Sequence, residues 1–151
     1  MLSRPVCHRR FTRRGAAAAE LAILLPFLAM MFVVAIDFAR VYYYGVVLGN
    51  CARNAAYYAG NYPQQYNYAN ATTAGQADGS DLTPSPNVVV AYDSSAAGSF
   101  ASTSPPASGG YVKATVSWQF STITNYPFPG MPNSFNLSRT VVMRICPLAT
   151  N

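Results

Sequence analysis

An uninterrupted apolar run constrains this chain more than any other feature of its sequence. From Ala16 to Ile36 the run contains a single charged residue, Glu20. A helix rises about 1.5 Å per residue, so this run forms a helix about 31 Å long, which matches the hydrocarbon core of a bilayer. Pro26 lies inside the run, and membrane helices tolerate such a proline as a kink. The sequence therefore predicts one transmembrane helix near the N-terminus.

The distribution of charge sets the orientation of that helix. The chain has ten basic and five acidic residues, and its formal net charge is +5. Five arginines precede Ala16, and the basic and acidic residues that follow it cancel, five against five. Basic residues directly before an apolar run favour a cytoplasmic N-terminus. Because the basicity belongs to this leader and not to a binding groove, nucleic acid is not an expected partner.

Two interpretations of the segment explain its hydropathy. A cleaved secretion signal would release a secreted, adhesin-like β-domain, but such signals have a shorter apolar run and a small-x-small cleavage site. The sequence from Ile36 to Arg40 does not supply that site. A plain signal anchor fits the length but leaves Glu20 unexplained, because a carboxylate in the membrane costs about 2.5–3.5 kcal/mol on insertion scales.

A third interpretation takes residues 13–21 as one unit: two arginines, a glycine, four alanines, a glutamate and a leucine. This unit resembles the processing site of type IV pilin-like precursors, which a prepilin peptidase cleaves after the glycine on the cytoplasmic side. The resemblance implies a scissile bond between Gly15 and Ala16, with Glu20 as the fifth residue of the mature chain. A carboxylate about one turn from a freed ammonium can neutralise it in a low dielectric.

The helix is expected to continue past the membrane, through about residue 59. Asp37 and Arg40 are three residues apart and are predicted to pair on one helix face. The tyrosines at 42–44 fit either an interfacial aromatic belt or ordinary packing. Gly45 and Gly49 are four residues apart, a spacing that lets another helix approach closely.

Together with Ala52-Arg53-x-Ala55-Ala56, these features make the segment from Arg13 to Ala59 similar to the TadE-like proteins, minor pseudopilins of tight-adherence (Flp) pilus systems. The resemblance implies a structural or assembly protein of such a pilus, with one helix in the bacterial inner membrane and a periplasmic C-terminal domain. The implied partners are the prepilin peptidase, a Flp-type pilin, other minor pseudopilins, the inner-membrane assembly platform and the lipid bilayer. A membrane-anchored periplasmic binding module is the alternative.

The rest of the chain predicts a small antiparallel β-domain, and so an α+β fold. Residues 60–110 are rich in small and polar residues, which predicts loop apart from one strand at 88–92. Residues 111–151 predict a hairpin, since two segments alternate strictly between apolar and polar side chains. The residues expected to face the core are Val112, Ala114, Val116, Trp118 and Phe120 in the first strand, and Leu137, Val141, Met143 and Ile145 in the second.

The connection between these strands contains three prolines, so it is not a tight turn. A similar proline-rich apolar loop lies between the two C-terminal strands of TadE-like proteins. Tyr126, Phe128 and Met131 are its apolar residues, and they either dock on a pilin or on the membrane, or fold back on the core.

The chain has three cysteines, and the first of them, Cys7, lies in the leader. Cys51 and Cys146 would both face an oxidising periplasm, which predicts a disulfide that closes a loop of about 96 residues and contributes roughly 4–5 kcal/mol on the chain-entropy model. Two separate thiols are the alternative.

Catalytic chemistry is not expected of this chain. Its single histidine, His8, lies in the leader, and Asp78, Asp81 and Asp93 lack the spacing of a calcium loop. The sequence therefore predicts no enzyme activity, no metal site and no cofactor.

Overall fold

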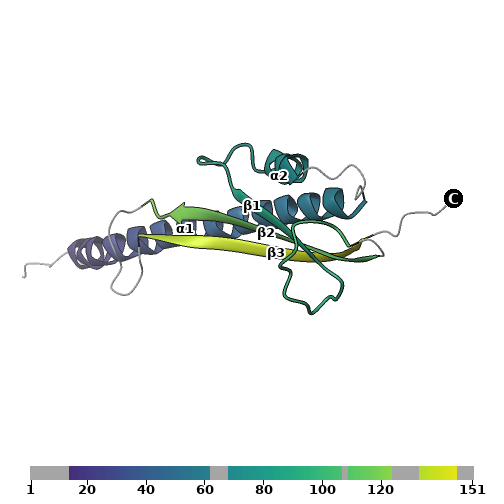
Figure 1. The fold of residues 1–151 in the computed structure, drawn as a ribbon. Coiled ribbons are helices and arrows are strands. Elements are labelled where there is room, and N and C mark those ends of the chain that lie inside the picture. The colour runs from purple at the N-terminus through teal and green to yellow at the C-terminus, as the bar shows by residue number, and fades with distance from the viewer. Residues whose placement is uncertain (1–13, 62–67, 107–108, 124–132, 146–151) are drawn as a thin grey trace, which may run out of the picture. The chain divides into compact units, whose positions relative to one another are not determined.

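A computed structural model describes residues 14–61, 68–106, 109–123 and 133–145. The chain divides into two compact units, residues 1–36 and residues 37–151. Helix α1 (Arg14–Asn61) contributes its first part to one unit and its second part to the other (Figure 1).

The first unit is the N-terminal part of α1. Its apolar side chains are exposed on every side of the helix, as Leu21, Ile23, Phe27 and Phe32 show, and Pro26 lies inside the helix. A helix that is apolar all round needs an apolar surrounding. Among the described residues, α1 is the one helix that is long and apolar enough to cross a membrane.

The second unit combines the rest of α1 with a three-stranded antiparallel sheet. Strands β1 (Asn87–Asp93), β2 (Gly110–Ser121) and β3 (Ser134–Ile145) lie in the order β1-β2-β3 (Figure 1). These three strands confirm the predicted hairpin with a third strand, and with the long helix they confirm the α+β class.

The core lies between α1 and one face of the sheet. Strand β2 points alternate side chains to the core because a pleated strand directs successive side chains to opposite faces: Val112, Ala114, Val116 and Phe120 are buried, and Trp118 is partly buried. Four alanines of α1 are fully buried, and their small side chains let the helix approach the sheet closely. The helix contributes Leu48, Ala52, Ala55, Ala56 and Ala59, and the strands contribute Val88, Val90, Tyr92, Val112, Ala114 and Val116.

Helix α2 (Tyr68–Ala77) was not expected, because residues 60–110 were predicted to be loop apart from one strand. That part of the prediction was wrong. Ala71 is fully buried, and a Cβ added at Gly75 would lie 2.9 Å from the Cβ of Ala55. The Nδ2 group of Asn54 donates a hydrogen bond to the Ala74 carbonyl at 2.8 Å. Small residues thus join α2 to α1 through close backbone approach, which a count of large apolar residues does not detect.

The Asp93 carboxylate organises the turn that follows β1. Its two oxygens accept hydrogen bonds from the backbone N–H groups of Ser95, at 2.9 Å, and Phe100, at 3.1 Å. These two bonds favour the ionised carboxylate and lower the pKa of Asp93. The backbone N–H of Tyr92 donates to the Ser102 carbonyl at 2.8 Å, so part of the outer edge of β1 is occupied.

Candidate functional site

The predicted processing segment lies in the first turns of α1. Gly15, Ala16 and Glu20 are all exposed, and a Cβ added at Gly15 would meet no atom within 4 Å. Ala16 and Glu20 are four residues apart and therefore share one face of the helix. The leader before Arg14, including Cys7 and His8, lies outside the described residues.

Beyond the apolar run, Asp37 and Arg40 join α1 to the end of β2. Arg40 Nη1 donates to Asp37 Oδ1 at 3.1 Å and lies 3.4 Å from the Ser121 carbonyl oxygen. The same Asp37 oxygen accepts a hydrogen bond from the backbone N–H of Ile123 at 3.2 Å. We call Asp37, Arg40, Ser121 and Ile123 the junction clamp.

Aromatic rings surround the arginine of the junction clamp. The Arg40 guanidinium carbon lies 5.1 Å from the centre of the Phe120 ring and 5.8 Å from that of Tyr44. Tyr44 also packs on Trp118, with ring centres 4.9 Å apart. Among the three consecutive tyrosines, Tyr44 therefore belongs to the packing of the sheet, whereas Tyr42 and Tyr43 are exposed.

The two ends of the predicted docking loop lie beside the junction clamp. The backbone N–H of Thr122 donates to the Asn133 carbonyl at 3.1 Å. Tyr126, Phe128 and Met131, the residues proposed for docking, lie outside the described residues.

The two glycines proposed for helix pairing have different surroundings. Gly45 is buried, and a Cβ added there would lie 3.1 Å from the guanidinium of Arg139. Arg139 Nε also lies within 3.4 Å of the Gly45 carbonyl oxygen. A Cβ at Gly49 would meet no atom within 4 Å, so of these two positions only Gly49 is open to another helix.

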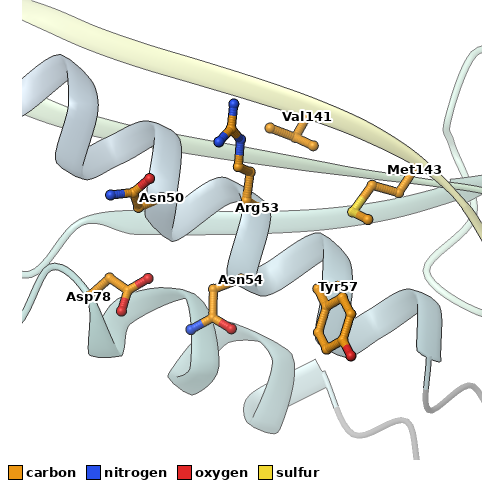
Figure 2. A pocket seen from close by; sticks show the side chains of 7 residues that line it. All are labelled: Asn50, Arg53, Asn54, Tyr57, Asp78, Val141 and Met143. Carbon is orange, nitrogen blue, oxygen red and sulfur yellow. The ribbon is translucent and has the colours of Figure 1, made fainter.

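An open groove lies along α1 in the second unit, with β3 on one side and Asp78, the residue after α2, on the other (Figure 2). Its volume is about 630 Å³, and its wall combines polar side chains of α1 with apolar side chains of β3. The lining residues are Asn50, Arg53, Asn54, Tyr57, Asp78, Val141 and Met143. The described residues contain no group of three or more His, Cys, Asp or Glu placed to hold a metal ion.

The thiol of Cys51 is free and fully buried. Burial raises the pKa of this thiol, and the Asp78 carboxylate adds to that effect. Cys146 lies outside the described residues. The Cys51–Cys146 disulfide therefore stays a prediction.

A comparison with known families gives one match, and it covers the predicted processing residues together with Asp37 and Arg40 of the junction clamp. The family model described as TadE-like protein matches residues 15–56. Over these residues the chain is similar to TadE-like proteins. The TadE-like segment covers Glu20, Asp37, Arg40 and Gly49, and it ends within α1. No curated protein and no solved structure matches the chain.

The similarity is confined to this part of α1. Sequence reasoning identified Asp37 and Arg40 but not their contacts with Ser121 and Ile123, or the contact of Arg139 with Gly45. Those pairs are separated by 81, 86 and 94 residues, and no local pattern in the sequence marks them.

Proposed function

We propose that this chain is a pilin-like structural and assembly protein of a Flp (Tad) pilus system, cut by a prepilin peptidase between Gly15 and Ala16. The family match carries the proposal, because it begins at the glycine that would precede the cut. Cleavage there would remove five arginines, and the remaining charged residues would cancel. The mature chain would start with a helix suited to the membrane.

The geometry of the first unit supports this proposal. Both residues of the scissile bond are exposed, and Glu20 lies one turn beyond Ala16 on the same helix face. In an assembly of such helices, this carboxylate would neutralise the new ammonium group of its own chain or of a neighbour.

The proposed partners follow from the same assignment. The peptidase and the assembly platform would meet the chain in the inner membrane, with the N-terminus in the cytoplasm and the C-terminal domain in the periplasm. The pilin and other minor pseudopilins would contact α1, where Gly49 is open, and the loop with Tyr126, Phe128 and Met131.

The N-terminus of the membrane-bound protein tests the cleavage directly. In cells with an active prepilin peptidase, intact-mass analysis should show a chain that begins at Ala16. Gly15→Ala should retain the leader, and Glu20→Ala should insert normally, but both should impair piliation. Gly49→Ala, an alanine substitution at another open glycine of α1, is the matched control and should be processed normally.

Two results would contradict the proposal. Normal piliation in both the Gly15→Ala and the Glu20→Ala variants would show that pilus assembly needs neither the proposed cleavage site nor the Glu20 carboxylate. An N-terminus at the original methionine would instead indicate a tethered binding module, and one near residue 40 would indicate a secreted domain.

A further inference from the structure

Strand β3 is an open edge of the sheet. Among the described residues it pairs with β2 on one side and with no strand on the other. At the opposite edge of the sheet, the backbone of Tyr92 in β1 already pairs with Ser102. An edge strand presents unpaired N–H and C=O groups to which another extended chain can add. The described part of the sheet can therefore accept a fourth strand along β3.

The groove of Figure 2 lies beside this edge, between β3 and the exposed face of α1. It continues toward Tyr42, because Asn50, Arg53 and Val141 also line an adjoining hollow of about 380 Å³. From Tyr42 to Tyr57 the helix rises about 22 Å, which is the length of roughly six or seven residues in an extended strand. The groove thus has room for the side chains of one short strand.

Two arginines give the groove its charge. Arg53 projects from α1 toward β3 (Figure 2). Arg139 of β3 lies opposite Val116 in the strand register, on the face of the sheet that packs on α1. Its Nε lies 3.4 Å from the Gly45 carbonyl oxygen, and the absence of a side chain at Gly45 lets the guanidinium lie directly on the helix.

These arginines are available to a carboxylate. Neither Arg53 nor Arg139 forms an ion pair with another described residue. Both line the hollow near Tyr42, which has no acidic residue in its wall, whereas Asp78 lies in the wall of the groove beyond it. Guanidinium groups bind carboxylates through paired, charge-assisted hydrogen bonds.

Charge also decides which kind of chain fits this edge. Strand β3 contains Arg139 and Arg144 and no acidic residue. Two copies paired through β3 would bring the arginines of both edges to one seam, and like charges on paired strands are destabilising. A strand that carries carboxylates would instead meet opposite charge. The open row of backbone N–H and C=O groups favours a polypeptide over a phosphate polymer.

We propose that β3 and the groove beside it bind an extended acidic segment of a partner protein. The segment adds to β3 as a fourth strand, and its carboxylates on the groove side pair with Arg53 and Arg139. Alternate side chains of a strand point to the same face, so acidic residues at every second position fit this site. The inference concerns the second unit alone, and it depends neither on cleavage after Gly15 nor on insertion of the apolar helix.

Fluorescence anisotropy tests the binding with the full chain in detergent micelles. The probe is a short fluorescein-labelled peptide in which glutamate alternates with valine, and the control peptide has glutamine in place of glutamate. The acidic peptide should bind about tenfold more tightly than the control peptide. Arg53→Gln and Arg139→Gln should each weaken its binding about fivefold, because each removes one ion pair.

Lys113→Gln is the matched control. It removes the same charge from β2, where Lys113 lies over the Phe100 ring at 4.8 Å from the ring centre and does not line the groove. It should change the affinity by less than about twofold. Hydrogen exchange tests the added strand, because the backbone amides of β3 that point away from β2 should exchange more slowly when the acidic peptide is bound.

Three results would overturn the inference. One is equal affinity for the two peptides, or an equal loss of affinity in the arginine variants and in Lys113→Gln. Another is binding without slower exchange in β3. The third is a dimer in micelles that the acidic peptide does not dissociate, which would assign the edge to a second copy. Far-UV circular dichroism confirms that each variant is folded, and Arg53, which is exposed on α1, suffices for the test if Arg139→Gln does not fold.

Discussion

At the scale of single residues, two helical glycines distinguish a packed surface from a free one. A Cβ at Gly75 would lie 2.9 Å from the Ala55 Cβ and 3.2 Å from the Cys51 carbonyl oxygen, whereas one at Gly49 would meet no atom within 4 Å. The Gly75→Ala substitution should therefore lower the free energy of unfolding, because overpacking costs about 1–3 kcal/mol and exceeds the helix-propensity gain of about 0.5–1 kcal/mol.

Gly49→Ala is the matched control, since it makes the same change in the same type of element. It should raise the free energy of unfolding by about 0.4–1 kcal/mol, because alanine restricts the unfolded chain without a clash. Denaturant unfolding of the full chain in detergent, followed by the fluorescence of its single tryptophan, Trp118, measures both changes. Shifts of the same sign in the two variants would contradict the packing of α2 on α1.

At the scale of elements, the strands were predictable and α2 was not. The alternation in β2 has a period of two, and that period alone decides which side chains face the core. Val112, Ala114 and Val116 are accordingly fully buried. Helix α2 has no comparable pattern, because its contact with α1 depends on the absence of a side chain at Gly75 and not on apolar volume.

The junction clamp shows a second limit of local patterns. The spacing of Asp37 and Arg40 indicated an ion pair on one helix face, and the structure contains that pair at 3.1 Å. The additional bonds from Ile123 to Asp37 and from Arg40 to Ser121 depend on how the sheet packs on the helix. The candidate site could thus be predicted on α1, but its connection to the sheet could not.

Substitution of Arg40 tests this connection. Arg40→Ala removes the ion pair with Asp37, the contact with the Phe120 ring and the bond to the Ser121 carbonyl. Because Arg40 is partly exposed, we expect a loss of about 1–2 kcal/mol in the free energy of unfolding. Arg53→Ala, an exposed arginine of the same helix, should change it by less than about 0.5 kcal/mol.

Denaturant unfolding again provides the measurement, and hydrogen exchange locates the effect. The backbone amide of Ile123 should exchange faster in Arg40→Ala than in Arg53→Ala, because Asp37 loses the partner that orients its carboxylate. Equal exchange at Ile123 in the two variants would show that the clamp does not hold the end of β2.

At the scale of the whole molecule, the two units require different surroundings. The apolar side chains of residues 15–36 are exposed on all sides of the helix, whereas the buried residues of the core run from Leu48 to Ile145 and belong to the second unit. Sequence reasoning could separate these units, because hydropathy identifies the helix and alternation identifies the sheet. The family match covers residues 15–56 and does not reach the strands.

Truncation tests whether the second unit folds without the first. A chain that starts at Asp37 retains α1 from the junction clamp onward, together with α2 and all three strands. Since the core lies within this unit, the truncated chain should fold in the absence of detergent. Its midpoint of thermal unfolding should lie within a few degrees of that of the full chain in micelles. The lost helix contributes no side chain to the buried core, which is the physical reason for this expectation. Molten-globule fluorescence of Trp118, or a requirement for detergent, would show instead that the apolar helix is needed to fold the β-domain.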